Sequence, residues 1–180
     1  DWEEPEKVAQ SIKIMKIKHA VITSVDRDDL KDMGSIIWNE TIKAIRRLNP
    51  NTTLETLIPD FQGNRINIDR IIKAAPEVVS HNLETVRRLT REVRVQAKYD
   101  QSLEVLQYLK QMGVNRTKSG IMLGLGEKEE EVFETLHDLR NASVEVVTIG
   151  QYLQPSKKHL PVKSFISPSI FEKYEAVAKD

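Results

Sequence analysis

Polar side chains that could bind a ligand or move a proton follow five short apolar runs of the sequence. In chain order they are Ser24, Asp26, Asp28, Asp29, Asp60, Gln62, Asn82, Glu84, Glu127, Gln151, Tyr152, Gln154 and Ser156. Their carboxylates, amides and hydroxyls can hold the hydroxyl or ammonium groups of a small molecule. Turns and helix caps also favour aspartate and asparagine, which accounts for about half of these residues without any site. Asp29 and Asp60 are predicted to be such caps.

Lys118, directly before the fourth run, is a candidate nucleophile. The period of two in a strand places it on one face with Gly120, Met122 and Gly124, which we expect to be the interior of a barrel. A buried lysine amine can form a Schiff base with a carbonyl substrate. An ion pair with an inward-facing acid such as Glu55 is the simpler interpretation, because a buried charge requires a partner.

The remaining motifs predict no nucleotide or metal site by themselves. The run Gly120–Glu127 has glycines that let a backbone approach a ligand, but it lacks the spacing of a dinucleotide or Walker loop. The acidic run Glu127–Glu131 is predicted to be a solvated first helical turn. The 4 histidines, His19, His81, His137 and His159, have no metal-ligand spacing, and His137 is predicted to lie on a helix surface.

Alternating strands and helices position these residues. Apolar runs at 19–24, 53–58, 78–82, 119–124 and 144–149 predict five buried strands. Helices are predicted over the first 15 residues, capped by Asp1, and at 36–48, 68–75, 84–93, 102–112, 129–140 and from Ser167 onward. This alternation indicates a parallel α/β sheet, either doubly wound or a (β/α) barrel. Because the carboxyl ends of parallel strands share one face, the polar residues should converge there.

The length bounds the size of this fold. A full (β/α) barrel takes about 250 residues, and the chain has 180. We therefore expect a single domain, residues 1–180, folded as an open, partial (β/α) TIM-like barrel with both sheet edges unpaired.

Composition excludes several classes of function. The chain carries 27 Lys+Arg and 27 Asp+Glu, which leaves no basic field for a nucleic acid. No run approaches the roughly 18 apolar residues of a membrane span, and no leader segment is recognisable. The absence of cysteine excludes disulfides, thiol catalysis and a Cys-ligated zinc or iron–sulfur cluster within this chain.

Five segments, in this order, resemble the lipoyl synthase family of radical S-adenosylmethionine (SAM) enzymes. They are residues 23–29 (Thr-Ser-Val-Asp-Arg-Asp-Asp), 57–63 (Leu-Ile-Pro-Asp-Phe-Gln-Gly), 81–85 (His-Asn-Leu-Glu-Thr), 118–127 (Lys-Ser-Gly-Ile-Met-Leu-Gly-Leu-Gly-Glu) and 150–156 (Gly-Gln-Tyr-Leu-Gln-Pro-Ser), and residues 158–162 agree too. The resemblance extends over nearly the whole chain. It implies that the chain holds strands two to six of a six-stranded radical SAM barrel.

The resemblance also implies a reaction. Lipoyl synthases insert two sulfur atoms, at C6 and C8 of an octanoyl chain that is attached to a lipoyl-carrier protein domain. One 4Fe–4S cluster cleaves SAM to a 5′-deoxyadenosyl radical, and a second, auxiliary 4Fe–4S cluster supplies the sulfur. The implied partners are the octanoylated carrier domain and an electron donor such as flavodoxin or ferredoxin. The implied location is the cytoplasm, or the mitochondrion in a eukaryote.

The residues that the resemblance assigns to SAM lie at the strand ends, and no catalytic residue is assigned. They are Thr23, Ser24, Asp26, Asn82, Glu84, Gly120, Met122, Gly124, Glu127, Gln151, Tyr152 and Gln154. The first three would hold the methionine ammonium, and Asn82 and Glu84 would hold the ribose. Met122 replaces an isoleucine of the family pattern and would lie against the adenine, whose edge the last three residues would read.

The sequence departs from the family in its cysteines. The family has a Cys-x3-Cys-x2-Cys loop after its first strand, a further three-cysteine set upstream and an Arg-Ser-Ser-Tyr segment near its C-terminus, and this chain has none of them. The chain thus resembles a truncated segment that can assemble neither cluster, and we expect it to be inactive alone. Its first strand would present an unpaired edge, which favours self-association.

Two other functions stay open. An aldolase-like barrel could use Lys118 as a Schiff base, which borohydride trapping with a carbonyl substrate would detect. A non-catalytic binding module or pseudoenzyme would explain the missing cysteines directly. The length and cysteine content of the full reading frame would separate this alternative from a lipoyl synthase.

Overall fold

A parallel sheet forms the centre of the computed structural model, which describes residues 1–179. In these residues it has five strands, β1 (His19–Thr23), β2 (Thr53–Leu57), β3 (Val78–Ser80), β4 (Arg116–Leu123) and β5 (Val146–Gln151), ordered as in the sequence. All neighbouring pairs are parallel. The predicted partial (β/α) barrel is confirmed, because the sheet is open and the described residues place β1 and β5 at its edges.

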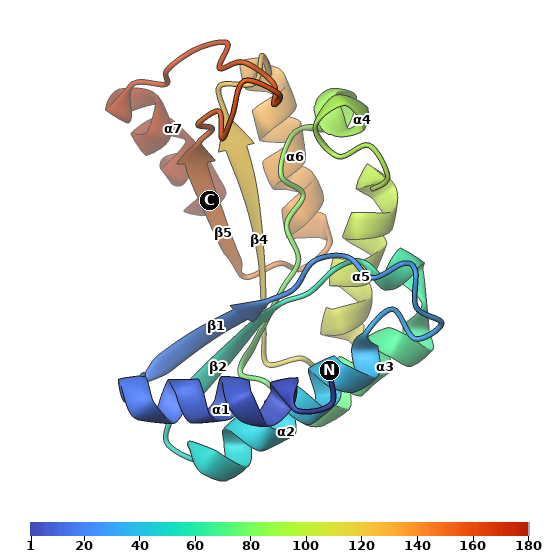
Figure 1. Cartoon of the computed structure of the whole chain (residues 1–180). Helices are drawn as coiled ribbons and strands as arrows, with labels where there is room; N and C mark the ends of the chain where they lie inside the picture. The colour runs from blue at the N-terminus through green and yellow to red at the C-terminus, as the bar shows by residue number, and fades with distance from the viewer. Residues whose placement is uncertain (180) are drawn as a thin grey trace.

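Helices cover the outer face of this sheet. They are α1 (Glu4–Met15), α2 (Ser35–Leu48), α3 (Arg65–Ala74), α4 (Thr90–Val93), α5 (Tyr99–Gln111), α6 (Glu129–Asn141) and α7 (Pro168–Lys179), with 3-10 turns at Phe61–Gly63 and Arg87–Leu89. In Figure 1, α1 and α2 lie along β1 and β2, whereas α6 and α7 lie along β4 and β5.

Two predictions of local structure are wrong. The helix predicted at 84–93 begins only at Arg87, because the backbone of Glu84 has a φ of +66° and pairs with Ile121 of β4 instead. Asp1 does not cap α1: Glu3 holds the cap position, and Asp1 Oδ1 accepts a hydrogen bond from the Glu3 N–H at 2.9 Å. The other elements lie within a few residues of their predicted ranges.

The apolar core lies between the strands and the helices. One cluster joins α1, α2 and α3 to the first three strands and includes the fully buried Ile42 and Leu54. A second cluster joins α5 and α6 to β4 and includes the fully buried Leu106 and Leu139. Because side chains alternate between the two faces of a strand, the inner face of the sheet is left free for polar groups.

A buried ion pair crosses this inner face. Lys118 Nζ lies 2.9 Å from Glu55 Oε1, and the Ser80 hydroxyl donates to the same carboxylate oxygen at 2.7 Å. Burial raises the pKa of Glu55, but the hydrogen bonds from Ser80 and Lys118 outweigh it, so its pKa lies below the ordinary value. The ion-pair prediction is confirmed. A lysine committed to a buried carboxylate is a poor nucleophile, which removes the structural support for the Schiff-base alternative.

The outer edge of β1 carries the first testable prediction. A groove of about 640 Å³ runs along this edge and is lined in part by Val21, Val25 and Trp38. Val21 is 55% exposed and Val25 is 75% exposed. We expect this chain to self-associate through β1, because an apolar, β-branched, unpaired edge is a template for strand pairing. Sedimentation velocity over a concentration series should show oligomers, and Val21→Lys should shift the distribution toward monomer.

The opposite result is equally clear. A chain that stays monomeric at high concentration, with amide exchange at Val21–Thr23 as slow as in β3 and β4, would contradict this prediction.

Candidate functional site

The predicted polar residues lie at one end of the sheet, because all five described strands run in the same direction. Thr23 ends β1, and Ser24 and Asp26 follow it. Asn82 and Glu84 follow β3. Residues 124–127 follow β4, and Gln151 ends β5, directly before Tyr152 and Gln154. Gly120 and Met122 lie within β4 itself.

Asn82 and Glu84 are held against the backbone of β4. The Glu84 N–H donates to the Gly120 carbonyl at 2.9 Å, and the Met122 N–H donates to the Glu84 carbonyl at 2.8 Å. A Cβ atom at Gly120 would lie 3.0 Å from Asn82 Oδ1 and 2.8 Å from Thr148 Oγ1, so only glycine leaves the Asn82 amide this position. Both residues are thus fixed against β4, and both are half-buried.

A tight loop follows β4. The Glu127 carboxylate accepts hydrogen bonds from the N–H groups of Gly124 at 2.6 Å and Leu125 at 2.9 Å. Glu131 caps α6 by accepting from the Lys128 N–H at 2.7 Å. The prediction that the run Glu127–Glu131 is simply solvated is therefore wrong at these two positions. The Glu127 carboxylate is turned toward the loop backbone and stabilises the conformation of the loop.

The residues at the end of β5 are engaged with the segment that follows. The Gln151 amide donates to the carbonyls of Leu123 at 3.2 Å, Tyr152 at 2.9 Å and Ser164 at 3.1 Å, and its oxygen accepts from the Ile166 N–H at 2.9 Å. The Tyr152 hydroxyl donates to the Leu160 carbonyl, and Gln154 donates to the His159 carbonyl, both at 2.8 Å. These three side chains thus hold the loop that covers the ends of β4 and β5.

A cavity of about 560 Å³ lies under this loop. Its apolar lining includes Val93, Met122, Leu125, Tyr152 and Leu160, and its rim includes Glu92, Lys158 and His159. A cavity with apolar walls and a few polar groups is typical of a small-molecule site. The sequence prediction included Met122 and Tyr152 but missed the other apolar residues, since their contact depends on the fold of the 155–166 loop.

Carboxylates gather beyond the ends of β1 and β2. Burial raises the pKa of Asp26, the nearby charges of Asp60 and Asp28 raise it further, and the charge of Arg94 lowers it. Carboxylates outnumber the single arginine here, so this site favours a cationic ligand group. Asp60 caps the turn at Phe61–Gly63 by accepting from the Gln62 N–H at 2.9 Å, as predicted. Asp29 is not a cap: it accepts hydrogen bonds from Arg27 at 2.8 and 2.7 Å.

His81 is a buried neutral residue beside the site. Its Nδ1 lies 2.9 Å from the Ile58 carbonyl and therefore donates to it, which leaves Nε2 to accept from the Ser102 hydroxyl at 2.9 Å. Burial lowers the pKa of His81 to about 4. The imidazole thus links β2, β3 and α5 and fixes the backbone that leads to Asn82.

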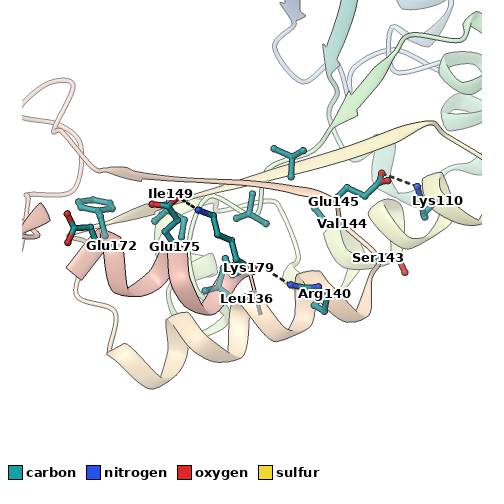
Figure 2. A pocket seen from close by; sticks show the side chains of 14 residues that line it. Lys110, Leu136, Arg140, Ser143, Val144, Glu145, Ile149, Glu172, Glu175 and Lys179 are labelled. Carbon is teal, nitrogen blue, oxygen red and sulfur yellow. Dashed lines mark hydrogen bonds and ion pairs between the residues drawn. The ribbon is translucent and has the colours of Figure 1, made fainter. Parts of the chain in front are cut away.

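Another cavity lies on the outer side of β5. It measures about 960 Å³ and is enclosed by α6, α7 and β5 (Figure 2). Four of its charged groups are paired locally, since Lys110 pairs with Glu145 at 2.9 Å and Lys179 pairs with Glu175 at 2.6 Å. It lies away from the carboxyl ends of the strands. The 560 Å³ cavity under the 155–166 loop, which we call the rim cavity, is therefore the better candidate site.

The donor set at the rim does not fit a metal centre. No group of three or more His, Cys, Asp or Glu side chains in residues 1–179 could hold a metal ion. The sequence contains no cysteine, so it offers an iron–sulfur cluster no thiolate. Among the same residues, no helix is long and apolar enough to cross a membrane.

Comparison with known proteins gives one family. A family model described as the radical SAM superfamily matches residues 1–139. The chain is 80% identical over 180 residues to the mitochondrial lipoyl synthase of Nematostella vectensis, a match that covers 100% of the chain and 62% of that protein. It is 80% identical over 175 residues to the lipoyl synthase of Flavobacterium johnsoniae, covering 97% of the chain and 61% of that protein.

Solved structures show the same fold at low identity. The FeFe-hydrogenase maturase HydG from Carboxydothermus hydrogenoformans superimposes with a TM-score of 0.78 at 17% identity, covering 99% of this chain and 43% of HydG. SuiB of Streptococcus suis bound to S-adenosylmethionine gives a TM-score of 0.73 at 11% identity, covering 97% of this chain and 39% of SuiB. These likenesses concern the fold alone.

Proposed function

The chain belongs to the radical SAM superfamily, and on that premise we propose that it is the central part of a lipoyl synthase, which inserts sulfur at C6 and C8 of a protein-bound octanoyl group. The observation that carries the proposal is the 80% identity to a lipoyl synthase along all 180 residues. We take residues 1–180 as one partial radical SAM core domain.

In this proposal the residues at the carboxyl ends of the strands bind SAM, with separate groups for its adenosyl end and its methionine end. Asn82 and Glu84 bind the ribose hydroxyls, and the absence of a side chain at Gly120 keeps the Asn82 amide against β4. Met122 packs against the adenine, and the rim cavity that it lines provides the volume. The chemistry that SAM supplies in this superfamily is hydrogen-atom abstraction from carbon.

The methionine end of SAM is assigned to the end of β1. Thr23, Ser24 and Asp26 would hold its ammonium group, and the acidic surroundings of Asp26 favour a cation there. The Ser24 hydroxyl oxygen already accepts from the Trp38 indole N–H at 3.1 Å, so its remaining hydrogen-bonding capacity is available to a ligand.

Gly124, Glu127, Gln151, Tyr152 and Gln154 complete the SAM set, with a supporting role for most of them. Glu127 and Gln151 use their hydrogen bonds on backbone groups, so they shape the adenine side of the cavity. Tyr152 contributes its ring to the cavity wall.

Some cofactors follow from membership of the superfamily, and the other cofactors and the partners are part of our proposal. Membership implies SAM and an iron–sulfur cluster, and two 4Fe–4S clusters are our proposal for the full-length protein. No step is assigned to a cluster on this chain, which has no cysteine to bind one. We propose an octanoylated lipoyl-carrier domain as substrate, flavodoxin or ferredoxin as reductant, and a cytoplasmic location, or a mitochondrial one in a eukaryote.

Reconstitution tests this function. The protein encoded by the full reading frame is loaded with iron and sulfide and given SAM, dithionite and an octanoyl-lysine peptide. It should release 5′-deoxyadenosine, and mass spectrometry should show that the peptide has gained two sulfur atoms. The 180-residue chain under the same conditions should give neither product, because it offers no thiolate to a cluster.

Two results would redirect the proposal. A full reading frame that also lacks cysteine and binds SAM without cleaving it would favour the non-catalytic alternative. A borohydride-trapped adduct on Lys118 would favour the aldolase-like one.

A further inference from the structure

Two of the segments that carry residues assigned to the adenosyl group come from different parts of the chain. One follows β3 and contains Asn82 and Glu84, and the other is the loop 124–127 after β4. At their base they are joined by the backbone hydrogen bonds of Glu84 with Gly120 and Met122. This pairing ends before the loop begins, so another contact must set the distance between the two segments.

Arg88 makes that contact. Its Nε donates to Glu131 Oε1 at 2.7 Å, and its Nη2 donates to Glu131 Oε2 at 2.8 Å and to the Gly126 carbonyl at 2.9 Å. We call Arg88, Glu131 and the Gly126 carbonyl the Arg88 clasp. A planar guanidinium can make this forked set of bonds, whereas a lysine ammonium cannot.

The clasp is continuous with the interior of the loop. Glu131 also accepts from the Lys128 N–H at 2.7 Å, so the same carboxylate binds Arg88 and caps α6. On the other side of the loop, Glu127 holds the N–H groups of Gly124 and Leu125. Glu127 therefore stabilises the loop by bonds within it, and Arg88 stabilises it by a bond from a residue outside it. The Arg88 hydrogen bond lowers the pKa of Glu131 to about 2, which keeps the clasp charged at neutral pH.

We propose that Arg88 is a positioning residue for the adenosyl site: it holds the loop 124–127 at a fixed distance from Asn82 and Glu84. This inference rests on the proposed function. Arg88 touches no assigned ligand position itself, and it acts through the Gly126 carbonyl and Glu131.

The neighbouring arginine provides a matched control. Arg87 pairs with Asp100 and Asp138 and lies over the Tyr99 ring, with 4.3 Å between its guanidinium carbon and the ring centroid. It thus joins α5 to α6, and none of these three partners belongs to the loop 124–127. Both arginines have half-exposed side chains, 44% for Arg87 and 50% for Arg88, so neither substitution should prevent folding.

The test uses the 180-residue chain with Arg88→Gln, Arg88→Lys, Glu131→Gln and Arg87→Gln. Two quantities are measured by NMR: amide exchange at residues 124–127, and the dissociation constant of 5′-deoxyadenosine as the probe. For Arg88→Gln we expect exchange about tenfold faster and a dissociation constant about tenfold higher, equivalent to about 1.4 kcal/mol. Arg88→Lys and Glu131→Gln should fall between this variant and the wild type, since each keeps part of the clasp.

Arg87→Gln should leave both quantities within twofold of the wild type, even where it lowers the melting temperature. The inference is overturned if Arg88→Gln lowers the melting temperature as Arg87→Gln does and leaves loop exchange and affinity unchanged. If the wild-type chain does not bind 5′-deoxyadenosine, the assignment of the adenosyl site fails, and faster loop exchange in Arg88→Gln then still establishes the clasp separately.

Discussion

Gly124→Ala should lower the free energy of unfolding by about 3 kcal/mol or more. Gly124 has a φ of +98°, where an L-residue is strained. Its Cβ would lie 2.5 Å from the Ser164 carbonyl oxygen and closer still to Gln151 Nε2. The carbonyl belongs to the backbone and cannot move without breaking the bonds that Gln151 makes. Urea unfolding followed by far-UV circular dichroism measures the loss.

Gly113→Ala separates strain from steric overlap. Gly113 also has a positive φ of +84°, but a Cβ there would meet no atom within 4 Å. Its substitution should therefore cost only about 1–2 kcal/mol, the cost of the left-handed conformation. Equal losses at the two positions would show that the close approach of Ser164 and Gln151 to Gly124 has no energetic consequence.

Lys118→Met should be the most damaging substitution on the inner face of the sheet, with a loss of about 3 kcal/mol. Glu55, whose side chain is 8% exposed, would lose its lysine partner and keep the Ser80 hydroxyl, with His19 Nε2 3.9 Å from its Oε2. The same change at Lys43, which pairs with Glu40 on the surface with both side chains at least 47% exposed, should cost within about 0.5 kcal/mol. Chemical denaturation at pH 7 measures both.

A double variant and a pH series identify the cause. Glu55→Gln with Lys118→Met removes both charges, so it should be more stable than Lys118→Met alone. Burial raises the pKa of Glu55, but the Ser80 hydrogen bond and then Lys118 bring it below the ordinary value of 4.5. The contribution of Lys118 is therefore present above that pH and is lost as the pH falls. The deficit of Lys118→Met should therefore shrink at acidic pH. A deficit that is constant with pH would mean that Lys118 acts through packing.

The strands and their order were predictable, because buried parallel strands are apolar and β-branched and alternate with helices. The amino end of β4 was missed by three residues, since Arg116 and Lys118 do not belong to an apolar run. Lys118 is tolerated in this strand because it faces the inner side of the open sheet, which helices do not cover, and pairs there with Glu55. The wrong helix at 84–93 has a tertiary cause: Glu84 gains backbone partners on β4 that no local pattern specifies.

The convergence of the site residues on one rim followed from strand direction alone. Their individual contacts did not, because the decisive partners are far apart in the sequence: 43 residues separate Arg88 from Glu131, and 21 separate His81 from Ser102. The roles of Glu127 and Gln151 as loop supports likewise depend on which backbone groups the fold leaves unpaired. Residue type indicated that these side chains are polar, but not toward which group each one turns.

The division of the core into two clusters bears on how the chain loses structure. Helix α5 is the element that contributes to both, with Val105 and Leu109 in the first cluster and Leu106 and Tyr99 in the second. Each half thus has its own apolar interior, and the two can open as separate cooperative units that share α5. A ligand bound from the end of β1 to the end of β5 would bridge these units and make their unfolding a single event.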